Sequence, residues 1–193
     1  MHFLHALTGF VLFFELPIPF YWLILHPFHS FWRTRIRAAF WFAGLTAWTS
    51  GGIALWLTRN ALLSPNSLSR YALTAGIALL AIEGYLFLRV EKELGSRRLV
   101  GHAELKGGGE MFSSGLYAHV RHPRYSGMFC AVAGAAFIAG TRALWIVLAI
   151  WLPFALIAIR LEEKELAIRF GSSYEAYRQN VPAFVPMMWK SKK

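Results

Sequence analysis

Long apolar stretches alternate with short polar segments along the whole chain. Five of these stretches approach the roughly 20 apolar residues that a helix needs to cross a bilayer. They are Phe3–Leu25, Ala38–Leu57, Tyr71–Val90, Tyr125–Gly140 and Leu144–Leu161. The pattern predicts an all-α, polytopic membrane protein with about five transmembrane helices. We expect one integral membrane domain, 1–193, in which three spans (1–90) precede a cytoplasmic loop, a helical hairpin and a tail (91–193).

Breaks in the apolar pattern predict local features of these helices. Pro17 and Pro19 should bend the first span, because proline interrupts the hydrogen-bonding pattern of a helix. Neighbouring helices can satisfy the carbonyls that the prolines free. The long connection 91–124 favours a functional loop. In the tail, apolar and aromatic residues recur at the spacing of one helical face, with Gly171 as a candidate interruption. They are Leu166, Phe170, Tyr174 and Tyr177. This tail helix is either a surface helix or a lid over a cytoplasmic site.

Composition and charge support the membrane interpretation and orient it. Charged residues make up 16% of the chain and the mean hydropathy is +0.44, whereas about 25% of the residues are charged in a typical soluble domain. Only Arg59, Arg70 and Arg142 of the 20 Lys and Arg lie on one side of the expected spans. The positive-inside rule then places the N-terminus outside and the C-terminus in the cytoplasm. Because orientation explains the basic charge, we expect no nucleic-acid partner; the sequence indicates no oligomeric state.

A polar and aromatic block, Gly115–Gly127, stands at the cytoplasmic entrance of the fourth span. Arg121-His122-Pro123 should open a helix, whose free N–H groups and Arg121 together suit an anion. Tyr117 and Tyr125 could stack on a planar ring or a cation. The competing interpretation is that the arginines and tyrosines anchor the protein at the lipid headgroups. The pattern predicts no metal site.

Three carboxylates, Glu162, Glu163 and Glu165, follow the fifth span, at the same end of the predicted hairpin. We expect them at a helix C-terminus, where negative charge is unfavourable and needs compensation. Solvent or a ligand cation could supply it. An anion site, aromatic faces and a cation partner together suit a zwitterion with a planar ring, of which S-adenosylmethionine is one example.

The order and spacing of these motifs resemble the membrane methyltransferases, which include the isoprenylcysteine carboxyl methyltransferases and the phospholipid N-methyltransferases. The resemblance covers about 109–186, with Gly115-Leu-Tyr, Arg121-His-Pro-x-Tyr-x-Gly127, Glu162-Glu163 and Phe170-Gly171. It implies an S-adenosylmethionine-dependent methyltransferase with a cytoplasmic cofactor pocket and a lipophilic acceptor in the bilayer. No catalytic residue is implied. The resemblance and the anion argument for Arg121 together give these candidate cofactor-binding residues: His102, Gly109, Glu110, Met111, Phe112, Tyr117, Arg121, His122, Pro123, Tyr125 and Glu162.

Candidate substrate contacts are less well defined by the pattern. The prenylcysteine enzymes carry an arginine one turn before the position of Glu162, where this chain has Ala158, so Arg160 is the nearest replacement. Glu163 is a second candidate. Glu83 and Glu15 lie inside predicted spans, where carboxylates are commonly functional. Two other functions stay open: a nicotinamide-dependent membrane reductase of related fold, and a small transporter with Glu15 and Glu83 along its path.

Overall fold

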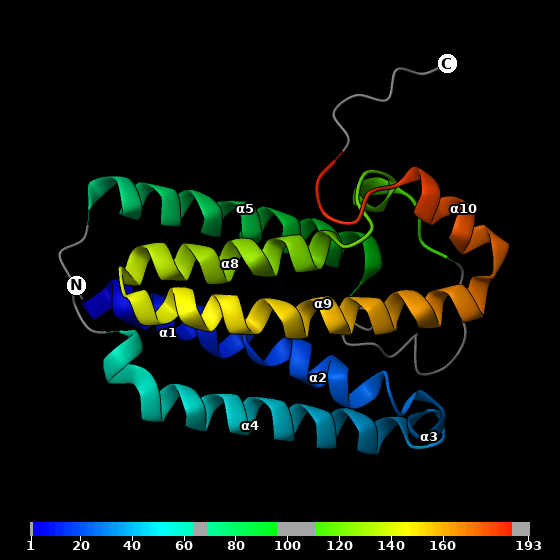
Figure 1. The fold of residues 1–193 in the computed structure, drawn as a ribbon, viewed down its shortest axis with the longest axis horizontal. Coiled ribbons are helices and arrows are strands. Elements are labelled where there is room, and N and C mark those ends of the chain that lie inside the picture. The colour runs from blue at the N-terminus through cyan, green and yellow to red at the C-terminus, as the bar shows by residue number, and fades with distance from the viewer. Residues whose placement is uncertain (1, 64–68, 96–110, 187–193) are drawn as a thin grey trace.

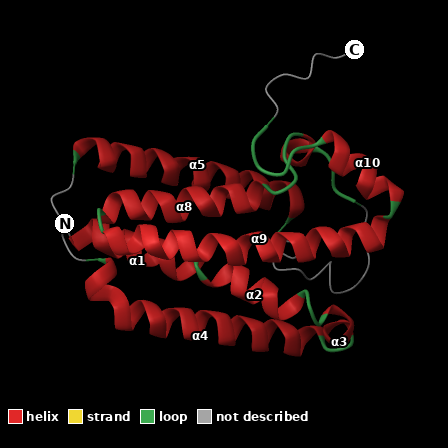
Figure 2. Cartoon of the chain, in the orientation of Figure 1, coloured by secondary structure: helices red, strands yellow, loops and turns green. Residues whose placement is uncertain are grey.

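The computed structural model describes residues 2–63, 69–95 and 111–186, and its described residues are helices joined by turns and loops (Figures 1 and 2). The helices are α1 (His2–Glu15), α2 (Pro17–Leu25), α3 (His29–Arg33), α4 (Ile36–Leu62), α5 (Arg70–Leu94), η1 (Gly115–Ala118), α8 (Pro123–Ala139), α9 (Arg142–Phe170) and α10 (Ser172–Asn180). The long helices lie side by side along one axis, while α3, η1 and α10 gather at one end of the bundle (Figure 1). All-α architecture is therefore confirmed for the part of the chain that the structure describes.

Three helical segments are long and apolar enough to cross a membrane: Phe3–Leu25, Arg70–Leu94 and Arg142–Phe170. The other two expected spans form helices α4 and α8, but neither meets the same criterion of length and composition among the described residues. Helix α8 has only 17 residues, and 12 of them are buried. The position of α8 inside the bundle explains why its buried residues are mainly alanine and glycine. As membrane spans, α4 and α8 stay predictions.

The helix of the first span is interrupted at Leu16, where the sequence predicts a bend. Helix α1 ends at Glu15, and α2 begins at Pro17, whose missing N–H costs little in a first turn. The carbonyl of Leu16 at this bend accepts a hydrogen bond of 3.2 Å from the Trp151 indole N–H of α9. A neighbouring helix thus satisfies a backbone group at the break, as expected inside a membrane.

Helices α5 and α8 approach each other closely because small residues face each other. A Cβ atom at Gly76 would lie 2.9 Å from the carbonyl oxygen of Gly134, and one at Gly134 would lie 3.0 Å from that of Gly76. Such small-residue contacts are typical of helix pairs in membranes. The close approach also brings the first residues of α8 next to Glu83 of α5, since a Cβ at Gly127 would overlap the Glu83 carboxylate.

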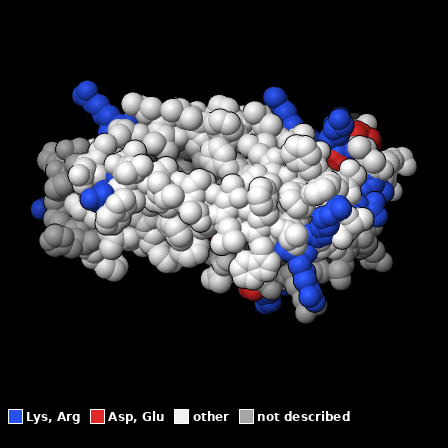
Figure 3. Space-filling view, turned by 90° about the horizontal axis from the view of Figure 1, so that it is seen from below, with Lys and Arg blue, Asp and Glu red and all other residues white. Residues whose placement is uncertain are grey.

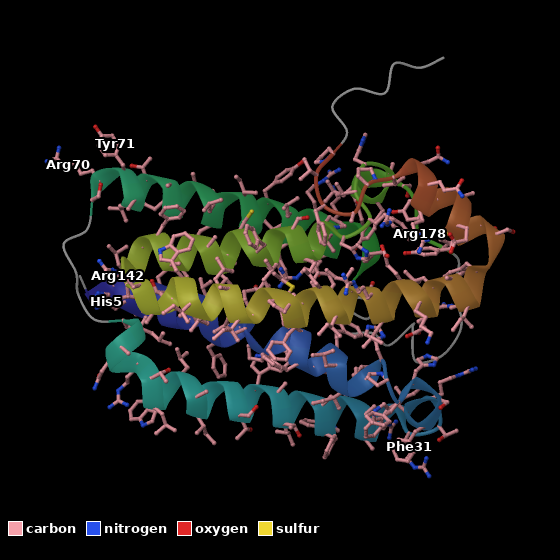
Figure 4. All side chains as sticks on the ribbon, in the orientation of Figure 1. His5, Phe31, Arg70, Tyr71, Arg142 and Arg178 are labelled. Atoms are coloured by element: carbon pink, nitrogen blue, oxygen red, sulfur yellow. The ribbon has the colours of Figure 1, made fainter. Side chains whose placement is uncertain are left out.

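Charge is concentrated at the two ends of the bundle. In the view of Figure 3, Lys and Arg side chains lie towards the ends and a broad uncharged belt lies between them. Figure 4 places Arg70 and Arg142 at one end and Arg178 at the other. Within the belt, large apolar side chains of α4 point outward: Trp41 is 71% exposed and Leu57 is 74% exposed. This distribution suits a molecule surrounded by hydrocarbon.

Candidate functional site

The site is built where the chain enters α8. His122 is the residue before this helix and Pro123 occupies its first turn, as the sequence predicts. Both side chains are buried. The backbone N–H groups of Arg121 and His122 donate to the carbonyls of Pro182 and Ala183, at 2.8 and 3.0 Å. The C-terminal segment therefore lies directly on this corner and holds it. We call the residues 111–126 with 162–163 and 174–184 the α8 corner.

Glu163 is the polar hub of the α8 corner. Its Oε1 accepts hydrogen bonds from Nε and Nη2 of Arg121, at 2.9 and 2.7 Å, and lies 3.0 Å from His122 Nε2. Nη1 of Arg121 also donates to the carbonyls of Arg178 and Val181, at 2.9 and 2.6 Å. Arg121 thus ties α9 to the tail, and its donors are engaged by the protein itself.

Glu162 has a different environment from its neighbour. Its side chain is 32% exposed, and its ion-pair contact among the described residues is a 3.9 Å approach of Oε2 to Nδ1 of His122. That distance exceeds hydrogen-bonding range, so the Glu162 carboxylate keeps capacity to accept hydrogen bonds from a ligand. The His122 side chain, which is 3% exposed, lies between the two carboxylates and is within hydrogen-bonding distance of Glu163 alone of the pair.

The expectation that these carboxylates sit at a helix C-terminus is wrong. Helix α9 continues to Phe170 and ends at Gly171, which has the positive φ of 54°. Glu162 and Glu163 therefore lie in the helix interior, and the arginine and histidine of the corner compensate Glu163. The predicted interruption at Gly171 is confirmed, because α10 restarts at Ser172. Tyr174 of α10 is buried, so α10 packs onto the corner through its aromatic face.

Several buried or half-buried aromatic residues belong to the α8 corner. The Tyr177 hydroxyl donates a 2.6 Å hydrogen bond to the carbonyl of Tyr117, which joins α10 to η1. Burial raises the pKa of Tyr177 to about 12, so this hydroxyl stays protonated at neutral pH. Phe112 and Tyr117 contact edge to face, with ring centroids 5.5 Å apart. The His122 ring lies 6.0 Å from that of Tyr125, measured between centroids.

The intramembrane carboxylates form an ion cluster that the sequence analysis did not predict. Arg124 Nη1 donates to Glu83 Oε1 at 2.6 Å, and Nη2 donates to both oxygens of Glu15 at 2.9 and 2.8 Å. We call Arg124, Glu15 and Glu83 the intramembrane triad. Its members come from α8, α1 and α5. A further unpredicted contact joins Glu165 to His26 and His29, at 2.9 and 3.1 Å.

The remaining candidates are placed as follows. Met111 and Phe112 are half-buried beside η1, whereas Arg160 is exposed on α9. His102, Gly109 and Glu110 lie outside the described residues. A signal for the triad was present in the sequence, since two carboxylates inside apolar stretches require a counterion and Arg124 directly precedes the fourth stretch. Only the fold shows that this one arginine contacts both.

Comparison with known proteins assigns this chain to a family. Residues 71–173 match the family of phospholipid methyltransferases. The chain belongs to this family. The match includes α5 from Tyr71, the α8 entrance and Glu162–Glu163. Glu83 and the parts 111–126 and 162–163 of the α8 corner therefore lie within it, whereas the tail part of the corner, 174–184, lies outside it.

Two relatives among these enzymes carry names that indicate different acceptors. The chain is 38% identical over 80 residues to the protein-S-isoprenylcysteine O-methyltransferase of Schizosaccharomyces pombe, covering 40% of this chain and 34% of the relative. It is 36% identical over 74 residues to the methanethiol S-methyltransferase of Crocosphaera subtropica, covering 38% of this chain and 28% of the relative. Each match thus spans about a third of the relative's length. No solved structure matches.

Proposed function

We propose that this protein transfers a methyl group from S-adenosylmethionine to a lipophilic acceptor held in the membrane. The observation that carries the proposal is the meeting of two segments within the family match. His122 lies 3.0 Å from Glu163 and 3.9 Å from Glu162, about 40 residues further along the chain. Motifs that the sequence resemblance treats as cofactor contacts therefore surround one corner, beside apolar helices that suit the bilayer.

The residues of the α8 corner fit the cofactor's chemistry. Glu162 retains the acceptor capacity that a ligand ammonium needs, and a hydrogen bond to a charged group is among the stronger kinds. Phe112, Tyr117 and Tyr125 offer aromatic surfaces for a planar ring or a sulfonium. When bound, S-adenosylmethionine supplies an electrophilic methyl group. We propose further cofactor contacts from Met111, Pro123 and the loop residues His102, Gly109 and Glu110.

The protein's own contribution is orientation and exclusion of water. Glu163 and Arg121 fix the His122 ring and the tail, so we assign Arg121 a positioning role rather than direct ligand contact. Methyl transfer needs an in-line approach in a dry site more than a strong base. Helix α10 and the segment from Val181 cover the corner, which supports the lid interpretation of the tail.

Methyl transfer itself is the test of this function. Membranes that contain the protein, supplied with methyl-labelled S-adenosylmethionine and a native lipid extract, are expected to move label into the organic phase. Membranes prepared without the protein give the background, and identification of the labelled lipid names the acceptor. Label no higher than this background, with correctly folded protein present, would contradict the proposal.

We further propose that the α8 corner faces the cytoplasm and the N-terminus faces outside. All but three of the 20 Lys and Arg lie on the corner's side of the expected spans, and such a bias sets orientation. A reporter fused after Lys193 is expected to give a cytoplasmic signal and one before Met1 an external signal. A cytoplasmic signal from both ends would mean an even number of spans and would contradict this topology.

A further inference from the structure

The first apolar span changes its packing partners at its break. Helix α1 packs on α8, whereas α2 packs on α4 and α9 (Figure 1). Helices α8 and α9 carry the residues that meet in the α8 corner, because His122 precedes α8 and the carboxylates Glu162 and Glu163 lie on α9. The break at Leu16 therefore joins the helix that contacts α8 to the helix that contacts α9.

Glu15, the last residue of α1, holds the first turn of α8. Both of its carboxylate oxygens accept from Nη2 of Arg124, at 2.9 and 2.8 Å. Arg124 is the second residue of α8 and follows His122 by two positions. Its guanidinium is also held from α5, by Glu83 and by the ring of Phe87, whose centroid lies 5.2 Å from the Cζ atom. A displacement of Glu15 would therefore be transmitted to the entrance of α8.

Charge compensation does not explain why Glu15 is a carboxylate. Glu83 alone balances the charge of Arg124, with 2.6 Å between nitrogen and oxygen. A second carboxylate in an apolar span adds a desolvation cost, and the Glu15 side chain is only 12% exposed. What Glu15 adds is a contact from a further helix, which restricts where the guanidinium can lie. The second carboxylate of the intramembrane triad therefore has a geometric role.

The α2 side of the break holds α9. The indole N–H of Trp151 donates to the Leu16 carbonyl at 3.2 Å. The Phe20 ring of α2 contacts that of Phe154 in α9, with centroids 5.0 Å apart. Pro153 lies between these contacts, inside α9, and a proline inside a helix interrupts its hydrogen bonds and permits a bend. The contacts thus hold α9 where its direction can change, about three turns before the carboxylates of the corner.

We propose that the break between α1 and α2 positions the α8 corner, with Glu15 and Arg124 as positioning residues for α8 and Trp151 as the positioning residue for α9. These residues act through His122 and Glu162, and we assign them no ligand contact. Glu15 lies outside the residues 71–173 that match the family, so the first span contributes a support that the family match does not contain. The inference rests on the proposed function only in taking cofactor affinity as one measure of the corner's geometry.

Hydrogen exchange of the unliganded protein in nanodiscs reports on the corner directly. The N–H groups of Arg121 and His122 donate to tail carbonyls, so a displaced α8 entrance should expose them. Glu15→Gln leaves Arg124 paired with Glu83 and should fold. A peptide that contains the two amides is expected to exchange about tenfold faster than in wild type, with α5 and α9 unchanged. Wild-type exchange at the corner, or equal acceleration throughout the bundle, would overturn the inference.

Two tryptophan variants test the contact with α9. Trp151→Phe removes the indole N–H and keeps an aromatic ring. Trp32→Phe is the matched control, since its N–H donates to the Ile24 carbonyl at 3.0 Å, within the segment of α2 and α3. Trp151→Phe should lower S-adenosylhomocysteine affinity about tenfold, because small displacements within a site are costly, whereas Trp32→Phe should bind like wild type. Equal affinities of the two variants would overturn the role of Trp151.

A double variant tests whether Glu15 acts through Arg124. Arg124→Lys keeps the charge but replaces the planar fork of donors by a single ammonium. Glu15→Gln should lower S-adenosylhomocysteine affinity about tenfold in wild type and less than about twofold in Arg124→Lys. Equal losses in the two backgrounds would overturn this route. A wild-type protein that binds no S-adenosylhomocysteine, while Glu15→Gln still speeds exchange at the corner, would support the positioning role and contradict the proposed function.

Discussion

Glu163→Ala is expected to lower the free energy of unfolding by about 3 kcal/mol, the lower end of the range for breaking a buried ion pair. The Glu163 side chain is 17% exposed, and its loss leaves Arg121 and His122, at 13% and 3% exposed, without their shared carboxylate. Arg121 also holds the carbonyls of Arg178 and Val181. The tail should therefore detach from the corner before the bundle unfolds.

The matched control is Glu175→Ala on α10. Glu175 pairs with Arg178 at 3.4 Å, but the two side chains are 43% and 49% exposed, and exposed pairs contribute about 0–1 kcal/mol. Unfolding of both variants in mixed micelles, followed by circular dichroism, gives the comparison. Limited proteolysis near residue 181 reports detachment of the tail. Equal stability losses in the two variants would show that Glu163 is not the hub of the corner.

Glu162→Gln is expected to weaken S-adenosylhomocysteine binding about 10- to 150-fold, the loss of one charge-assisted hydrogen bond worth about 1.5–3 kcal/mol. The substitution preserves shape, and Glu162 is partly exposed with a contact of only 3.9 Å to His122. Stability without ligand should therefore stay close to wild type. We therefore expect the two adjacent carboxylates to have different roles: Glu163 should support the fold and Glu162 should bind the ligand.

Isothermal titration of S-adenosylhomocysteine into the purified variant measures this effect. Glu175→Gln serves as the control, because Glu175 lies on the exposed face of α10 and pairs only loosely with Arg178. Unchanged affinity of Glu162→Gln, in a variant that melts like wild type, would remove Glu162 from the cofactor site and leave Glu163 as the remaining carboxylate of the pair.

The sequence predicted the helices well because apolar runs of membrane length leave few alternatives to helix. Proline marked the start of α2 at Pro17 and the start of α8 at Pro123 for the same stereochemical reason. The end of α9 was missed, because the apolar pattern marks the bilayer boundary and not the helix boundary. Helix formers such as Glu, Lys, Leu and Ala continue to Phe170. Only Gly171 ends the hydrogen-bonding pattern.

The site was only partly predictable from the sequence. Local motifs indicated that His122 and Glu162 share one end of a hairpin, and the structure brings their side chains within 3.9 Å. Pairings between distant residues were not predictable, since any of several arginines could have met Glu15 or Glu83. The choice of Arg124 follows from the close approach of α5 and α8 at Gly76 and Gly134. The hydrogen bonds of Pro182 and Ala183 carry no sequence signal because they use backbone atoms.

The central claim is that the α8 corner binds S-adenosylmethionine, and ligand-dependent melting of the wild-type protein in detergent tests it most directly. A ligand that binds the folded state raises its stability by RT ln(1 + [L]/Kd), where [L] is the free ligand concentration. S-adenosylhomocysteine is expected to raise the melting temperature in a concentration-dependent manner, and NADPH at the same concentrations is not. Stabilisation by NADPH alone would contradict the account and favour a membrane reductase.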